Sequence, residues 1–324
     1  MNCNHIVTHN DLFSNRVMTF FLFYVSLYSC IPIQSQKGGS TKETHPDLLC
    51  TLYNMMESNR KKILSFDLDM TLVDDQTNTI PQSALDAVEK VRNDYHIVIA
   101  TGRDLNLQAN RFVLEQIRPE AWVHNNGTQV HINGECIYYR TFDKKLLKKL
   151  LDFCQEHEIC ICAALNNVQY ATNREKLKPI LPILSGTDSP EWGDINELIH
   201  LPVQTLGMVG DEEQAEFMRR SFPQLKFPTV IPGIWCDIME PEVSKVLGMQ
   251  KVIEYYGCTM QDVIAFGDSM NDYEILSAAG YSVAMGNAAE KLKEIADMVT
   301  DDVDKDGIAK ALEKICIDAK GQRA

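Results

Sequence analysis

Short apolar runs recur along the chain from residue 62 onward. They occupy residues 62–66, 96–100, 121–124, 263–266 and 281–285. Runs of this length without polar alternation are typical of strands buried on both faces of a parallel sheet. Between the first two runs, Pro81 stands at a helix start, and Leu85, Val88 and Val91 share one helical stripe. A strand, a helix and a second strand make a βαβ unit, so the pattern predicts an α/β fold with a doubly wound parallel sheet.

The hydrophobic pattern changes after about residue 130. Residues 129–141 alternate between apolar and polar positions around Asn133-Gly134, a pair typical of a tight β-hairpin. Residues 143–157 predict a helix with one leucine-rich face and one lysine-rich face, and a lysine-rich face is typical of a solvated surface. Further elements are predicted as a strand-like stretch at 159–172, a helix near 212–220 and a strand pair near 226–239. These elements predict a separate α+β domain inserted into the core.

The patterns together predict three parts. Residues 1–57 form an N-terminal extension, residues 58–129 and 240–324 form the core domain, and residues 130–239 form the inserted α+β domain. A chain of 324 residues is long enough for two hydrophobic cores of moderate size.

The N-terminal extension contains an uncharged apolar segment, residues 17–33. Its length suits an export signal or a short membrane anchor, and Cys30 offers an acceptor for a lipoprotein-type signal. A third interpretation is a start codon placed too early, because the chain from Met56 onward reads as a short charged lead into a buried strand. We favour a cytoplasmic protein that begins near Met56, with export or membrane contact through residues 17–33 as the alternative.

Charge and cysteine content narrow the classes of function. Lys and Arg total 31 and Asp and Glu total 45, so the net charge is −14 and nucleic acid is not expected as a partner. A small anionic substrate would need local cations. The ten cysteines include no CxxC pair and several lie in apolar runs, which indicates reduced, buried thiols.

Polar residues follow the first two predicted strands directly. Asp67 and Asp69 come after residues 62–66, and Thr101-Gly102-Arg103 comes after residues 96–100. The carboxyl ends of parallel strands meet at one edge of a sheet, where ligands bind in such folds. That edge therefore gathers two carboxylates, a hydroxyl, a glycine amide open to close approach, and a guanidinium.

A second group of polar residues follows the insert. Lys245 stands at the start of a predicted helix, and Asp268, Asn271 and Asp272 follow the strand at residues 263–266. Taken singly, each of these motifs is also typical of a turn or a helix cap. Together, four carboxylates at one sheet edge would repel one another unless a cation were bound. Carboxylate oxygens suit a hard cation such as Mg²⁺, and Lys245 and Arg103 add positive charge.

With these motifs in this order, the chain resembles the haloacid dehalogenase-like superfamily, specifically its Cof-type hydrolases of subfamily IIB. The motifs are FDLDMTL, ATGRD, HNNGT, EVSKVLG and GDSMND, and the resemblance covers about residues 60 to 320. It implies a Rossmann-like core and an inserted α+β cap of the C2B type. Two positions depart from the family pattern, because Met70 and Val246 replace glycines.

The resemblance also implies roles for the residues of the sheet edge. Asp67 would attack phosphorus to give an aspartyl-phosphate, and Asp69 would act as general acid and then general base. Mg²⁺ would be held by Asp67, Asp69 through its carbonyl group, Asp268 and Asp272, with orientation of Lys245 as the alternative role of Asp272. Thr101, Gly102, Arg103, Lys245 and Asn271 would bind the phosphoryl group or the substrate.

The implied function is that of a Mg²⁺-dependent phosphatase acting on small phosphorylated metabolites, such as sugar phosphates or phosphorylated cofactors. A phosphosugar mutase and a non-catalytic protein that binds phosphorylated ligands are the alternatives. Residues 125–127 resemble a hinge at the entrance to the cap with a role in substrate contact, and Trp235, Asn166 and Asn167 are candidates for substrate selection. No oligomeric state follows from the sequence.

Overall fold

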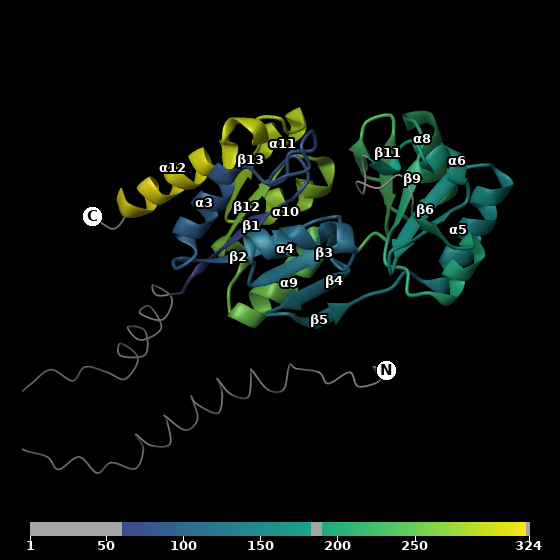
Figure 1. Cartoon of the computed structure of the whole chain (residues 1–324), viewed down its shortest axis with the longest axis horizontal. Coiled ribbons are helices and arrows are strands. Elements are labelled where there is room, and N and C mark those ends of the chain that lie inside the picture. Colours follow the sequence, from purple (N-terminus) through teal and green to yellow (C-terminus); the bar gives the residue numbers. More distant parts are fainter. Residues whose placement is uncertain (1–59, 183–189, 322–324) are drawn as a thin grey trace, which may run out of the picture. The chain divides into compact units, whose positions relative to one another are not determined.

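The computed structural model of the protein describes residues 60–182 and 190–321 (Figure 1). The predictions for residues 1–57, including the apolar segment 17–33, Cys30 and Met56, lie outside these residues. Within the described ranges, no helix combines the length and the hydrophobicity that crossing a membrane requires.

The larger of two sheets has eight strands. They are β1 Lys62–Phe66, β2 Tyr95–Ala100, β3 Ala121–His124, β4 Gln129–Ile132, β5 Glu135–Tyr139, β12 Val263–Gly267, β13 Tyr281–Ala284 and β14 Met298–Val299. Their order across the sheet is β14-β13-β12-β1-β2-β3-β4-β5. All neighbours from β14 to β3 are parallel. The predicted parallel strands are therefore confirmed.

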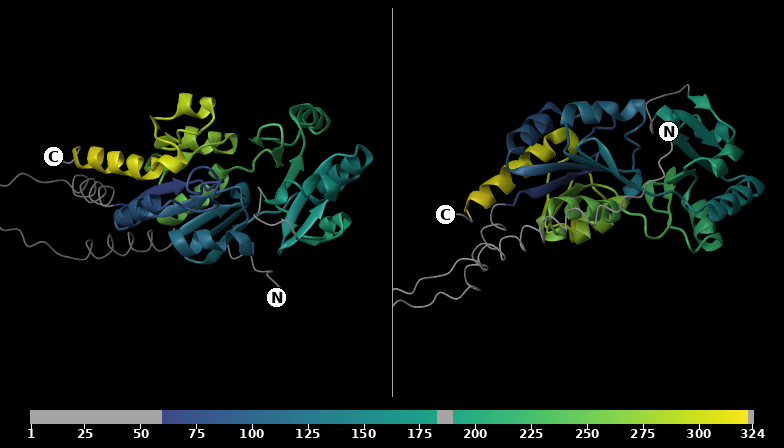
Figure 2. Two further views of the ribbon diagram at one scale, coloured as in Figure 1. Left: turned by 45° about the horizontal axis from the view of Figure 1, so that its top comes forward. Right: turned by 90° about the horizontal axis from the view of Figure 1, so that it is seen from below.

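Helices cover both faces of this sheet (Figure 2). They are α3 Gln82–Val91, α4 Arg111–Ile117, α9 Lys245–Tyr256, α10 Tyr273–Ala278, α11 Glu290–Ile295 and α12 Gly307–Gly321. Helix α3 packs against α12 and α4, whereas α9 packs against α10 and against β2, β3 and β4. Helix α3 follows Pro81 and buries Ala84, Val88 and Val91, with Leu85 partly buried beside them. The predicted α/β fold with a Rossmann-like, doubly wound sheet is confirmed.

The apolar runs predicted as strands are buried because the central strands have helices on both faces. In β1 every residue after Lys62 is buried, and in β12 all five residues are buried. The rings of Phe66 and Phe266 stack with their centroids 4.7 Å apart across the β1–β12 pair. Asp67 and Asp268 follow these two strands directly, so the register of the pair sets their separation.

The hairpin predicted around Asn133-Gly134 forms, with both turn residues at positive φ. Its strands β4 and β5 extend the large sheet, because β4 pairs with β3 in the antiparallel direction. The prediction that the insert begins with this hairpin was therefore wrong about the sheet that the hairpin joins. The turn signal is local and does not specify which strand edge the hairpin meets.

The smaller sheet has six strands. They are β6 Cys160–Leu165, β7 Val168–Ala171, β8 Glu191–Trp192, β9 Leu206–Val209, β10 Thr229–Ile231 and β11 Trp235–Ile238, in the order β10-β11-β9-β6-β7-β8. The helices of this part are α5 Lys144–Glu156, α6 Arg174–Leu177 and α8 Glu212–Ser221. This part has its own hydrophobic core. The division into domains at residues 58, 130 and 240 stays a prediction, apart from the hairpin of β4 and β5, which belongs to the large sheet.

Helix α5 has the two faces that its sequence predicts. Its buried residues are Leu147, Leu150, Leu151 and Cys154, and Lys144, Lys145, Lys148 and Lys149 are exposed. The Asp143 side chain caps the helix by accepting a hydrogen bond from the Leu146 amide at 2.8 Å. Cys154 is one of several buried free thiols, with Cys160, Cys162, Cys236 and Cys258.

Two segments connect the large sheet with the small one, and an ion-pair cluster joins them. Arg140 follows β5, and its guanidinium lies 3.1 Å from carboxylates of both Glu240 and Glu242, which follow β11. Because the two connections are tied to each other, they lie side by side between the sheets.

Candidate active site

A cavity of about 580 Å³ opens beyond the carboxyl ends of the central parallel strands and is lined by both sheets. Six of the predicted site residues line it: Asp67, Asp69, Gly102, Arg103, Asp268 and Asn271. The other three, Thr101, Lys245 and Asp272, are buried. The predicted residues therefore form a layer that lines the cavity and a buried layer that supports it.

Lys245 is the centre of the supporting layer. Its Nζ donates to Asp67 Oδ1 at 2.5 Å and to Asp272 Oδ1 at 2.6 Å, and all three side chains are buried. Burial lowers the pKa of the lysine, but the charges of Asp272 and Asp67 outweigh it and raise the pKa above its usual value. The ammonium therefore stays charged and fixes one oxygen of Asp67.

The acidic residues next to Lys245 repel one another. Burial, followed by the charge of Asp272, raises the pKa of Asp67 in spite of Lys245. Burial and the charges of Asp67 and Asp272 raise the pKa of Asp268 well above its usual value. One lysine does not balance the two buried carboxylates of Asp67 and Asp272 together with the partly buried one of Asp268, and such an excess of negative charge is typical of a cation site.

The arrangement fits a hard divalent cation. Asp67, Asp268 and Asp272 each offer a carboxylate oxygen, and these atoms lie within 4.8 Å of one another. In Asp272, Oδ1 accepts from Lys245, and Oδ2 accepts from the amides of Asp268 at 3.1 Å and Ser269 at 3.3 Å. Asp272 thus accepts three hydrogen bonds, which makes Asp67 and Asp268 the better donors to a cation. Thr71 Oγ1, which the sequence reasoning gave no role, donates to Asp268 Oδ1 at 3.3 Å.

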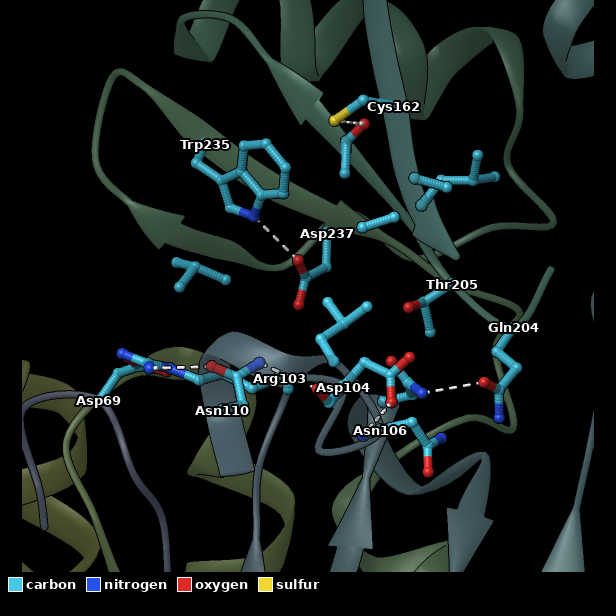
Figure 3. Close-up of a pocket in the computed structure, with 18 of the residues that line it drawn as sticks. Asp69, Arg103, Asp104, Asn106, Asn110, Cys162, Gln204, Thr205, Trp235 and Asp237 are labelled. Atoms are coloured by element: carbon cyan, nitrogen blue, oxygen red, sulfur yellow. Dashed lines mark hydrogen bonds and ion pairs between the residues drawn. The ribbon is translucent and has the colours of Figure 1, made fainter. Parts of the chain in front are cut away.

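Asp69 lies apart from this group, with its carboxylate held by Arg103. Arg103 Nε donates to Asp69 Oδ1 at 2.8 Å, Nη2 donates to the same oxygen, and Nη1 donates to Asn110 Oδ1 at 3.2 Å (Figure 3). Thr101 Oγ1 accepts from the Arg103 amide at 3.0 Å. The guanidinium therefore orients Asp69 and leaves Asp69 Oδ2 open to the cavity.

The side-chain amides of Asn126 and Asn271 lie beside the backbone of Gly102. A Cβ at Gly102 would lie 3.2 Å from Asn126 Oδ1 and 3.4 Å from Asn271 Nδ2, so glycine leaves the backbone accessible there. Asn271 Nδ2 donates to Asn126 Oδ1 at 3.4 Å, and Ser269 Oγ donates to Asn271 Oδ1 at 2.7 Å. Asn126 was placed in a hinge by the sequence reasoning. The structure shows it beside the phosphate-binding candidates.

The loop that carries Asn126 has a special backbone. Asn125, Asn126 and Gly127 all have positive φ, and a Cβ at Gly127 would lie 1.9 Å from the carbonyl oxygen of Ser244. Only glycine allows that approach. The run of asparagine and glycine was the sequence signal for this loop, since these residues are the ones that favour positive φ.

Met70 also has positive φ, at 54°. Its amide donates to the Val73 carbonyl at 2.8 Å, and Asn287 Nδ2 donates to the Met70 carbonyl at 2.8 Å. This conformation accounts for the glycine that the family pattern has here. The two hydrogen bonds hold the methionine in it, and the side chain lines the cavity.

We expect Met70→Gly to be more stable than Met70→Ala by about 1 kcal/mol in free energy of unfolding. Both variants lose the same packing of the methionine side chain, but only glycine removes the cost of positive φ. Urea denaturation of the two variants measures the difference. A Met70→Ala protein that is as stable as Met70→Gly would show that position 70 is not strained.

The small sheet contributes an acidic residue to the cavity, Asp237 on β11. Trp235 Nε1 donates to Asp237 Oδ1 at 3.0 Å (Figure 3). Asn126 Nδ2 donates to Asp237 Oδ2 at 2.7 Å. The candidates for substrate selection, Trp235, Asn166 and Asn167, all line the cavity. Asp237 was missed, because nothing in its local sequence shows that it meets Asn126.

Comparisons with known proteins agree with this architecture. The family model of the haloacid dehalogenase-like hydrolases matches residues 64–312. The putative phosphatase YkrA of Bacillus subtilis is 32% identical over 256 residues, which cover 78% of this chain and 97% of YkrA. The 5-amino-6-(5-phospho-D-ribitylamino)uracil phosphatase YitU of the same organism is 26% identical, with 78% of this chain and 96% of YitU covered.

Solved structures show the same fold. The subclass IIB sugar phosphatase BT4131 has a TM-score of 0.72 at 27% identity, covering 79% of this chain and 100% of that one. The phosphatase BT1666 from Bacteroides thetaiotaomicron has a TM-score of 0.71 at 27% identity, covering 86% of this chain and 98% of that one. The chain therefore belongs to the haloacid dehalogenase-like hydrolases of subfamily IIB and is an enzyme of their phosphatase group.

Proposed function

We propose that the protein is a Mg²⁺-dependent phosphatase that hydrolyses small phosphorylated metabolites through an aspartyl-phosphate on Asp67. The observation that carries the proposal is the buried contact of Lys245 with Asp67, at the base of a cavity of a size that suits a small molecule. The names of the relatives are consistent with it, since YitU is called a phosphatase of a phosphorylated ribitylaminouracil and BT4131 a sugar phosphatase.

The nucleophile and the acid have separate environments. Lys245 holds Asp67 Oδ1, so Oδ2 is the oxygen that attacks phosphorus in line and forms the new P–O bond while the ester bond breaks. Arg103 holds Asp69 Oδ1, so Asp69 Oδ2 carries the proton that passes to the leaving oxygen. Asp69 then takes a proton from the water that attacks the aspartyl-phosphate, and inorganic phosphate is released.

The remaining predicted residues support these two. The Gly102 amide and Asn271, which line the cavity, hold the phosphoryl oxygens, and Asp272 orients Lys245. The phosphoryl contact predicted for Thr101 becomes one of supporting this loop, because Thr101 is buried and its hydroxyl accepts from the Arg103 amide. The binding role predicted for Arg103 becomes one of orienting Asp69, because its guanidinium is occupied by that carboxylate and by Asn110. Mg²⁺, for which Asp67 and Asp268 are suitable oxygen donors, would supply the positive charge that lets a carboxylate approach a phosphate dianion.

The test is release of inorganic phosphate from p-nitrophenyl phosphate and from a panel of phosphorylated metabolites. We expect release in Mg²⁺, a decrease of about 100-fold after chelation with EDTA, and recovery when Mg²⁺ is added back. Hexose 1-phosphates in the panel are also analysed for hexose 6-phosphates. Isomerised product without free phosphate would indicate a phosphosugar mutase, and unchanged release in EDTA would contradict the metal dependence.

A further inference from the structure

Asp237 lies on the cavity wall opposite Asp69 and is the carboxylate that the small sheet contributes there (Figure 3). Both of its oxygens accept a hydrogen bond, but the donors, the Asn126 amide and the Trp235 indole, are uncharged. A carboxylate oxygen can accept two hydrogen bonds, so each retains one acceptor site. Asp237 is thus a carboxylate, facing the cavity, that no described residue neutralises by an ion pair.

The position of Asp237 is fixed from two directions. A Cβ at Gly207 would lie 1.9 Å from the Trp235 ring, so the indole packs directly against the backbone of the neighbouring strand β9. On the other side, Asn126 also contacts Asn271, which belongs to the proposed phosphoryl-binding group. Hydrogen bonds through Asn126 therefore link Asp237 to the proposed phosphoryl-binding group.

The charges around the cavity are unevenly distributed. Among the described residues that line it, six are aspartates and two are arginines, so a bound molecule meets an excess of negative charge. Arg103 is already paired with Asp69, and Arg111 is an exposed residue. The lining residues between Cys162 and Trp235 carry no charge, and the four lysines of α5 are not among the lining residues.

The two ends of the cavity therefore suit different groups. At the large sheet, Lys245 and the proposed cation balance the phosphoryl charge. At the small sheet, the other lining residues are uncharged, some apolar, such as Leu206, and some polar, such as Asn166 and Thr205, and Asp237 is the one carboxylate described among them. An acidic group placed there would be brought, partly desolvated, against a like charge with no cation to neutralise it.

We propose that Asp237 determines substrate specificity by accepting hydrogen bonds from hydroxyl or amino groups of the leaving group and by repelling a second acidic group. The substrate is then a phosphomonoester whose leaving group is a polyol, a sugar or an amine, without a carboxylate or a further phosphate. This inference rests on the proposed phosphatase activity.

The experiment uses esters of similar carbon skeleton that differ in charge. Glucosamine 6-phosphate, glucose 6-phosphate and 6-phosphogluconate have cationic, neutral and anionic leaving groups, and glycerol 3-phosphate with 3-phosphoglycerate repeats the neutral and anionic comparison on three carbons. We expect kcat/KM for the neutral and cationic esters to exceed that of the acidic partner by at least about 100-fold. Comparable values for acidic and neutral esters would overturn the proposal.

The variant Asp237→Asn removes the charge at nearly constant shape. We expect the kcat/KM of the neutral esters to exceed that of the acidic esters by less than about 10-fold in this variant, mainly because kcat/KM for the acidic esters rises. Asp152→Asn, an exposed position on α5, is the matched control and keeps the wild-type ratio. If Asp237→Asn discriminates between neutral and acidic esters as strongly as the wild type does, Asp237 does not determine this specificity. If that variant does not fold, the wild-type ratios alone still decide whether acidic leaving groups are excluded.

The same measurements distinguish a failure of the proposed specificity from a failure of the proposed phosphatase activity. Wild-type protein that hydrolyses p-nitrophenyl phosphate but does not discriminate by charge contradicts only the specificity. Protein that releases no phosphate from any ester in Mg²⁺ contradicts the proposed phosphatase activity itself.

Discussion

Asp67→Asn is expected to lose at least about 10⁴-fold in kcat for phosphate release, because the amide cannot form the aspartyl-phosphate. The fold should not suffer. Burial and Asp272 raise the pKa of Asp67, which means that the folded protein disfavours the charged form of this side chain. Asparagine has nearly the same shape and no charge, so it removes the cost of burying a charged carboxylate. The free energy of unfolding of Asp67→Asn at neutral pH should therefore equal or exceed that of the wild type.

The measurements are phosphate release from p-nitrophenyl phosphate and urea denaturation of the same preparations. Asp86→Asn, an exposed position on α3, is the control and should match the wild type in both. Activity of Asp67→Asn within tenfold of the wild type would exclude Asp67 as the nucleophile. If Asp67→Asn loses both its activity and much of its stability, the loss of activity would be explained by a disturbed structure and would contradict the expected result.

Lys245→Met is expected to lose about 10³-fold in kcat and to lower the free energy of unfolding by about 3–5 kcal/mol. The lysine contacts Asp67 and Asp272 in a fully buried position, so its removal leaves two carboxylates facing each other without a counter-charge. Circular dichroism during urea unfolding gives the stability, and phosphate release gives the activity.

A double variant separates the two effects of the lysine. Lys245→Met with Asp272→Asn removes one of the uncompensated carboxylates, so much of the lost stability should return while the activity stays low. Recovery of activity in the double variant would show that Lys245 acts only by balancing Asp272. A Lys245→Met protein as stable as the wild type would contradict the buried ion pairs.

The parts of this site that the sequence predicts are those whose position follows from a single strand. Asp67 and Asp268 come directly after buried apolar runs, and parallel strands bring their ends to one edge, so their approach to each other could be predicted. Lys245 could be assigned only through the family motif, because a lysine at a helix start is more often exposed. Its full burial depends on how α9 packs, which local sequence does not specify.

Asp237, which sequence reasoning missed, depends on a contact between distant segments. It lies 111 positions from Asn126, which belongs to the predicted hinge with a role in substrate contact, and neither residue has a local pattern that indicates the other. The same limit applies to the fold. The turn of the β4–β5 hairpin could be predicted from local sequence, but its pairing with β3 could not. Short-range patterns thus predicted the elements and the acidic edge, whereas the wall opposite that edge required the structure.

Gly127 and Gly248 bring two backbones together at the start of α9. A Cβ at Gly127 would lie 1.9 Å from the Ser244 carbonyl oxygen, and one at Gly248 would lie 3.0 Å from the Gly127 Cα. With no space for a side chain between them, the loop that carries Asn126 packs directly against the start of the helix that carries Lys245. The lysine that contacts Asp67 and the amide that contacts Asp237 are therefore carried by two segments whose backbones touch, so this one backbone contact links the two walls of the cavity.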